Sequence, residues 1–249
     1  MVFAYIFLEG RSVEEVGETL DFGAELKVAL FEMGGQTIYL TETVINTWII
    51  IAVMALIALI IRIKANKFKE VPDSKFQTAI EMIVDTLNGF VSSTMGGSSG
   101  KKFAAYFGPL IIFIAVCNLS GLLGFRPPTA DFATTLAFAL ITFFMIHGFG
   151  IKSKGLKYFK GFLEPLPLLL PINIIGELAT PVSLSFRLFG NILGGSIIMG
   201  LVYAMFPKLV IFLGIPAVLH CYFDVFAGAL QAFIFVMLSM TFVSNAMDE

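Results

Sequence analysis

A single arginine lies within a long apolar stretch of this sequence. Between residues 165 and 247 the only formally charged side chains are Glu177, Arg187, Lys208 and Asp224. An arginine that faces lipid at the middle of a bilayer costs roughly 2.5–3.5 kcal/mol on insertion scales. Arg187 is therefore expected to face protein or water, where its fixed positive charge can attract a carboxylate.

The residues around Arg187 predict a surface that receives another helix. Ser183, Arg187 and Asn191 are four residues apart, so they lie on one face of a helix. Gly190 and Gly194 thin the neighbouring surface, and small residues allow a second helix to come close. This pattern suits a moving partner helix that carries a carboxylate.

Three more polar side chains lie in the same stretch. Asp224 and Gln231 are seven residues apart, nearly two helical turns, and are predicted to share one face of a second helix. Gln231 would then hydrogen-bond Arg187 across the helix pair, and Asp224 would titrate or pair with a cation. Glu177 lies ten residues before Arg187 on a face rotated by about 80°, where it would line a water-filled path.

Less specific interpretations of these residues stay open. Arg187 and Asp224 could form a purely structural buried pair, or Arg187 could extend its long side chain to the membrane surface. Ser196 and Asn173 suit helix packing as well as function.

The sequence lacks the usual signatures of an enzyme or a metal site. The two histidines, His147 and His220, have no metal-ligating neighbours at useful spacing, and His147 is best explained as a residue at a span end. No serine lies in a Gly-x-Ser-x-Gly context, and GGSSGKK at 96–102 lacks the phosphate-loop pattern. We expect no catalytic residue, no bound metal and no cofactor.

The composition is that of a helical membrane protein. Of 249 residues, 57% are hydrophobic and 14% are charged, and the mean hydropathy is +0.90. Soluble domains carry about 25% charged residues. The long, continuous apolar runs argue against a β-barrel and for an all-α integral membrane protein in the lipid bilayer. A basic patch interleaved with aromatic residues would predict a nucleic-acid partner, but the sequence has no such patch.

The predicted elements follow the apolar runs and the charges between them. Alternating spans would place the lysine and arginine clusters at 62–69, 101–102 and 152–160 on one side of the membrane, which the positive-inside rule makes cytoplasmic. The amino terminus would then lie outside and the carboxyl terminus in the cytoplasm. In order, we expect an acidic extracytoplasmic segment (1–40) with a short helix near 13–30, a first transmembrane helix (41–64), an amphipathic membrane-surface helix (73–95), a flexible break (95–100), a transmembrane hairpin (103–150) and a long helical hairpin that forms an ion path (165–249).

Hydropathy alone allows more than one arrangement of the last of these elements. A helix over residues 171–206 would be about 54 Å long, which exceeds the bilayer core, so it must tilt strongly, kink or break. A second apolar segment follows Pro207, over residues 208–246. A hairpin of two long helices is the simplest arrangement, although three or four shorter spans would fit equally well.

At this point the residues resemble a known family. PVSLSFRLFGNI (181–192), followed by LQAFIF (230–235) and preceded by CNLSGLLGFRPPTADFATTLAFAL (117–140), is similar to the a subunit of the bacterial F-type ATP synthase. The resemblance implies a non-catalytic stator subunit in the bacterial inner (plasma) membrane. Its implied partners are the rotating c-subunit ring, the b subunits of the peripheral stalk and other ATP synthase subunits, with a strongly tilted hairpin facing the rotor.

The resemblance also implies roles for single residues. Two aqueous half-channels would carry H⁺ or Na⁺ to and from the carboxylates of the ring. Arg187 matches the arginine that separates the half-channels, and Asn191 and Gln231 match positions close to it. The sequence does not distinguish between the two ions.

Three positions depart from the family pattern. Ser196 stands where an acidic residue is common, and Asn173 stands where a glutamate is frequent, with Glu177 nearby. Asp224 occupies a position that is histidine in some members and acidic in others. Asp224 and Glu177 are therefore the best remaining candidates for half-channel carboxylates.

Two other classes of function fit the bare composition. An autonomous secondary transporter or ion channel would use Arg187 to bind an anionic substrate, but the internal repeats typical of transporters are not recognisable. A membrane enzyme would need a nucleophile and base or a metal set, and neither pattern is present.

Overall fold

The fold was analysed in a computed structural model that describes residues 26–33, 36–69, 72, 74–155, 157–163, 166–205 and 214–247. Within these residues, five helical runs are long and apolar enough to cross a membrane. The prediction of an all-α integral membrane protein is confirmed for this part of the chain, apart from a small β-hairpin near the amino terminus. The helices are α3 (Glu42–Ala65), α4 (Lys75–Met95), α5 (Gly97–Leu119), α6 (Phe132–Lys154), α7 (Lys157–Gly161), α8 (Leu170–Met205), α10 (Ile215–His220) and α11 (Gly228–Met247).

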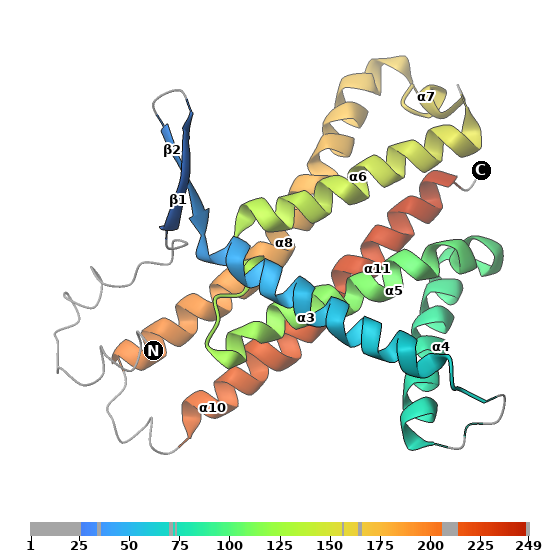
Figure 1. Ribbon diagram of the computed structural model, residues 1–249. Helices are drawn as coiled ribbons and strands as arrows, with labels where there is room; N and C mark the ends of the chain where they lie inside the picture. The colour runs from blue at the N-terminus through green and yellow to red at the C-terminus, as the bar shows by residue number, and fades with distance from the viewer. Residues whose placement is uncertain are drawn as a thin grey trace.

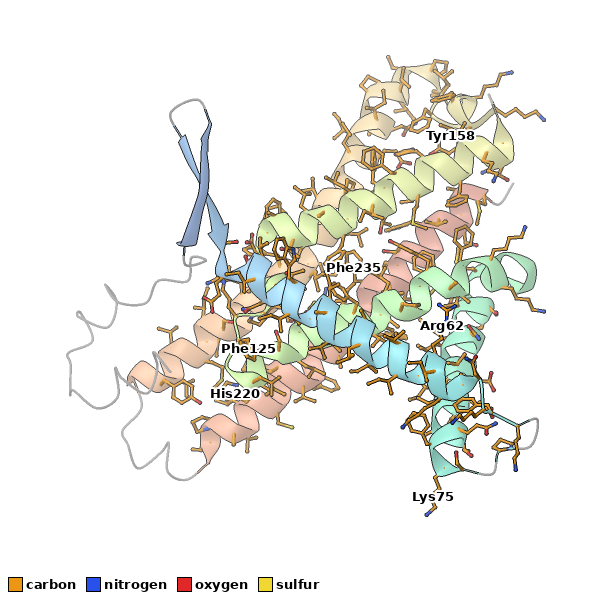
Figure 2. The ribbon with its side chains drawn as sticks, in the orientation of Figure 1. Arg62, Lys75, Phe125, Tyr158, His220 and Phe235 are labelled. Carbon is orange, nitrogen blue, oxygen red and sulfur yellow. The ribbon has the colours of Figure 1, made fainter. Side chains whose placement is uncertain are left out.

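Four helices form the central bundle, in which α6 packs against α8 and α11, and α5 packs against α11 (Figure 1). The core consists of large side chains that all four helices contribute. Phe107, Ile114, Leu188 and Phe235 are at most 1% exposed, and Figure 2 shows Phe235 at the centre of the bundle. Burial of each such side chain stabilises the fold by roughly 1.5–3 kcal/mol, so this core fixes which faces of α8 and α11 turn inward.

The residues before the first span form an antiparallel hairpin of β1 (Leu26–Met33) and β2 (Gln36–Thr41). The predicted helix near 13–30 is therefore wrong over 26–30, and its earlier part lies outside the described residues. The signal that was missed is a pair of short apolar runs separated by Gly-Gly, which is typical of a tight hairpin.

Helix α3 touches the bundle mainly near its amino-terminal end. Thr43 and Asn46 are buried there, because Thr43 Oγ1 donates to Asp131 Oδ2 (3.0 Å) and Asn46 Nδ2 donates to the Arg126 carbonyl (3.0 Å). Asp131 also caps α6 by accepting a hydrogen bond from the Ala133 amide (3.1 Å). The loop between α5 and α6 is thus tied to α3, while most of α3 farther along is exposed (Figure 1).

The amphipathic helix α4 folds back against α5. Ser74 caps it by accepting from the Gln77 amide (3.1 Å). The expected flexible break at 95–100 is wrong in extent, because only Gly96, at φ 80°, separates α4 from α5. A Cβ at Gly100 would lie 2.4 Å from Ser92 Cα, so glycine is needed there for the two helices to meet.

The last third of the described chain is a pair of long helical runs. Helix α8 continues through Pro181 for 36 residues, about 54 Å at the standard rise. The second run covers 33 residues from Ile215 to Met247 and contains a π-helical segment, Cys221–Ala227, between α10 and α11. The connection between the two runs, including the start of the predicted second helix, lies outside the described residues.

Candidate functional site around Arg187

Arg187 lies on an exposed face of α8. Ser183, Phe186 and Gly190, which share this face, are exposed as well. Within the described part of the chain, Arg187 makes no hydrogen bond and no ion pair. The purely structural Arg187–Asp224 pair that the sequence left open is therefore not formed here.

The opposite face of α8 is locked into the bundle. Leu184, Ser185 and Leu188 are buried, and the Ser185 and Thr135 hydroxyls lie 3.1 Å apart between α8 and α6. At the edge of the exposed face, the ring of Phe186 also packs against Phe132 at the start of α6, with 4.8 Å between the two centroids. These contacts set the rotation of α8 about its axis, and that rotation turns Arg187 outward.

Two contacts fix the register between α8 and the second helical run. Asn191 Nδ2 donates a long hydrogen bond (3.4 Å) to the Ala227 carbonyl. One turn farther, a Cβ on Gly195 would meet Phe223 Cβ at 3.4 Å, whereas a Cβ on Gly194 would meet nothing within 4 Å. Gly194 therefore leaves open space beside the helix pair, between the levels of Arg187 and Phe223.

The expected hydrogen bond between Gln231 and Arg187 is not formed. Gln231 is 6% exposed, and its Nε2 atom lacks a hydrogen-bond partner among the described residues. Arg187, in contrast, points away from the bundle. The argument that Asp224 and Gln231 share a face assumed a regular α-helix, but π-helical backbone lies between them and changes the rotation per residue.

Asp224 belongs to a group that we call the hairpin cluster: Tyr203, His220 and Asp224. His220 Nδ1 lies 2.5 Å from Asp224 Oδ2, and His220 Nε2 lies 3.0 Å from Tyr203 Oη. The sequence prediction missed His220 and Tyr203. The available signal was the four-residue spacing of His220 and Asp224, which places them on one helical face.

A second group, the α7 cluster, contains His147, Tyr158, Asn173 and Glu177. His147 Nδ1 lies 2.7 Å from Tyr158 Oη. Asn173 Nδ2 donates to the Phe162 carbonyl (2.9 Å), which ties the start of α8 to the segment after α7. Burial, and then the negative charge of Glu177, raise the pKa of the Tyr158 hydroxyl above its usual value.

The two remaining predicted residues have separate surroundings. Ser196 Oγ donates to the Ile192 carbonyl of its own helix (3.0 Å), so it makes no contact with another element through that bond. Ser183 is exposed on the face of Arg187. Among the described residues, no three His, Cys, Asp or Glu side chains are grouped closely enough to hold a metal ion.

Comparison with known proteins identifies the family. The model of the family described as ATP synthase A chain matches residues 44–244. The ATP synthase subunit a of Moorella thermoacetica is 37% identical over 220 residues, which cover 88% of this chain and 95% of the relative. ATP synthase subunit a 2 of Bradyrhizobium sp. is 37% identical over 222 residues, which cover 88% of this chain and 94% of the relative.

A relative with a stated ion is also similar. The protein named ATP synthase subunit a, sodium ion specific, from Propionigenium modestum is 34% identical over 229 residues, which cover 84% of this chain and 75% of the relative. The family match covers every membrane-crossing run except the ends of the first and last. The chain therefore belongs to the ATP synthase A chain family, the non-catalytic ion-conducting stator subunit of the F-type ATP synthase.

Proposed function

We propose that Arg187 faces the carboxylates of a rotating c-subunit ring and separates two aqueous half-channels. The exposure of Arg187 carries this proposal, because no other described residue neutralises its charge. A lone arginine on an apolar face is stable in a membrane only where protein or water covers it. A ring carboxylate that passes by would cover it transiently.

The surface around Arg187 fits such a partner. The π-helical segment exposes Tyr222 (56%) and Phe226 (58%), and α8 exposes Phe186 (55%). Helix α6 packs against the opposite face of α8, and α5 packs against α11, so the face of α8 that carries Arg187 stays exposed. Exposed aromatic side chains on both helical runs provide an apolar surface along which a ring of helices can move.

The two half-channels would approach Arg187 from opposite ends of α8. Glu177 and Asn173 lie toward α7, and Ser183 lies between them and Arg187. On the other side, Asn191 and Ser196 line α8 toward the open space beside Gly194, and Asp224 faces that region from the second run. By the same register, Gln231 packs in the bundle at about the level of Arg187.

Electrostatics explains why the ring would release its ion at Arg187. A positive charge within about 4–6 Å favours the charged form of a carboxylate, so the ion leaves. Water at the exposed guanidinium keeps the effective dielectric high, and the attraction stays shallow enough for the ring to move on. The same charge prevents an ion from passing straight between the half-channels.

The orientation and the remaining partners follow from the charges and the uncovered surfaces. The basic ends of α3 and α6 and the start of α5 lie at one end of the bundle, as Figure 1 shows. We place this end in the cytoplasm, with the amino terminus outside and the carboxyl terminus inside. The exposed length of α3 offers a surface to the b subunits of the peripheral stalk.

Disulfide cross-linking to the ring tests the proposed surface. The variant Gly190→Cys should cross-link to a cysteine placed next to the ring carboxylate in the purified complex. The matched control is Ile141→Cys, which is exposed on α6 away from the hairpin face and should not react. Both variants need a Cys221→Ser background, because Cys221 is exposed whereas Cys117 is buried. Equal cross-linking of both would contradict the proposed surface.

The alternative of an autonomous transporter is not supported. The family model covers residues 44–244, and the relatives carry the name of an ATP synthase subunit over most of the chain.

A further inference from the structure

We propose that the hairpin cluster is a proton relay in which His220 takes up and releases the proton on the α10 side of Arg187. This inference rests on the proposed stator function and deepens it, because it names the residues and the ion of one half-channel. Figure 2 shows His220 near the end of the hairpin, far from Tyr158 in the other cluster.

Both nitrogens of the His220 ring are engaged. With Asp224 ionised, its carboxylate accepts, and Nδ1 then carries the hydrogen and lies 2.5 Å from Oδ2. Nε2 of the neutral ring then accepts from the Tyr203 hydroxyl at 3.0 Å. An imidazole connected at both nitrogens can receive a proton on one side and give one up on the other.

The cluster is neither sealed in the core nor fully in solvent. The side chains of His220 and Asp224 are 33% and 22% exposed. The exposed part of each side chain can meet water if a half-channel opens at this position. The π-helical segment that carries Asp224 is a feature found frequently at functional sites, where it displaces a side chain from the regular helical position.

The helix register connects the cluster to Arg187. Ala227 faces Asn191, and Phe223 faces Gly195, so Asp224 lies at the level of the open space beside Gly194. Arg187 is eight residues before Gly195 on α8, which is about 12 Å at the standard rise. A short column of water in this space would join Asp224 to the face that meets the ring.

In each transfer through the hairpin cluster, one proton enters and one proton leaves. A proton that arrives along Tyr203 is taken up by His220 Nε2, and the ring becomes an imidazolium. The Nδ1 proton then passes to Asp224, which becomes neutral and hands its proton to water beside Gly194. Exchange with water moves the remaining ring hydrogen from Nε2 to Nδ1 and restores the starting state.

This arrangement favours protons over sodium ions. Hard cations bind to oxygen ligands, but the N–H of His220 already occupies one oxygen of Asp224. The Nδ1–H group offers a metal cation no lone pair, whereas a proton crosses the ring by changing partners.

The test compares the two histidines in the reconstituted ATP synthase. His220→Gln keeps a polar side chain but cannot relay a proton, so ATP synthesis driven by a proton gradient should fall roughly a hundredfold. His147→Gln is the matched control and should stay close to the unchanged complex. The amount of assembled complex is measured for each variant.

Chemical rescue separates a relay from a structural role. In His220→Ala, imidazole added to the compartment that faces α10 should restore a large part of the lost synthesis, whereas imidazole in the other compartment should not. An assembled His220→Ala complex that imidazole does not rescue would overturn the relay. Synthesis driven by a sodium gradient alone would overturn the choice of ion.

The same variants distinguish a failure of the proposed relay from a failure of the proposed stator function. If His220→Gln synthesises ATP normally while Arg187→Ala does not, the relay is wrong and the stator function stands. If both variants synthesise ATP normally, the proposed function itself is wrong.

Discussion

Two regions of this protein combine a histidine, a tyrosine and a carboxylate, and they lie at opposite ends of the bundle. Tyr158 marks the α7 cluster and His220 the hairpin cluster in Figure 2. Glu177 precedes Arg187 on α8, whereas Tyr203 follows it. Arg187 thus lies between two groups of similar composition.

The two groups differ in how their atoms are connected. His147 bonds Tyr158 through Nδ1, but its Nε2 is buried with no hydrogen-bond partner among the described residues. His220 uses both nitrogens and is one third exposed. A buried ring with one connection cannot pass a proton onward, so we interpret the α7 cluster as a clamp and the hairpin cluster as a relay.

The clamp has a clear structural purpose. The Tyr158 ring rests on Gly150 of α6, where a Cβ would come within 2.4 Å of Tyr158 Cε2. Together with the bond from Asn173 to the Phe162 carbonyl, this contact holds α7 at the junction of α6 and α8. The clamp therefore fixes the start of the helix that carries Arg187.

The largest effect should come from removing the residue between the two clusters. Arg187→Ala is expected to abolish ATP synthesis in the reconstituted complex, because nothing then displaces the ion from the ring or separates the half-channels. Synthesis and ATP-driven pumping are both measured in proteoliposomes. Full pumping by this variant would contradict the separating role.

The leak that follows this change should depend on one cluster only. In membranes with Arg187→Ala, passive proton conduction is expected, and adding His220→Gln should reduce it about tenfold or more, since the relay is general acid–base chemistry. Adding His147→Gln should leave it unchanged. Dye quenching during an imposed pH gradient measures the conduction, and equal effects of both second changes would remove the distinction between relay and clamp.

A smaller effect is expected from crowding the clamp. Gly150→Ala should displace the Tyr158 ring and break its bond to His147, at a cost of roughly 1–3 kcal/mol to the local packing. Trypsin should then cut after Lys157 and Lys160 several times faster in the assembled complex, an order-of-magnitude expectation from that cost. Gly148→Ala is the control, because a Cβ there meets nothing within 4 Å.

The smallest effect concerns alkaline pH. The raised pKa of Tyr158 means that its neutral form stabilises the clamp below about pH 10, and that this contribution is lost as the pH rises through the higher folded-state value. Cleavage of α7 by an alkaline protease should therefore accelerate above about pH 10. This acceleration of cleavage should be absent in Tyr158→Phe. An acceleration that persists in this variant would show that another group causes it.

Much of the fold could be predicted from the sequence, because long apolar runs leave few alternatives. Helix α8 has the 54 Å length expected over 171–206, within a residue at each end. The hairpin before α3 was not predicted, because its two strands are short and a weak helical pattern overlaps them. The break predicted after Met95 consists of Gly96 alone, since α4 and α5 pack closely enough to need glycine at position 100.

The sequence alone determined the membrane class, the long helices and the family, because hydropathy and the motif around Arg187 are local properties of the chain. It also placed Ser183 and Arg187 on one face. The tertiary structure decided which face of α8 is uncovered, because that depends on contacts with α6 and α11. It also decided that His220 joins Tyr203 to Asp224, whereas His147 is hydrogen-bonded through Nδ1 alone among the described residues. These bonds connect residues that are distant in sequence or displaced by a π-helical turn.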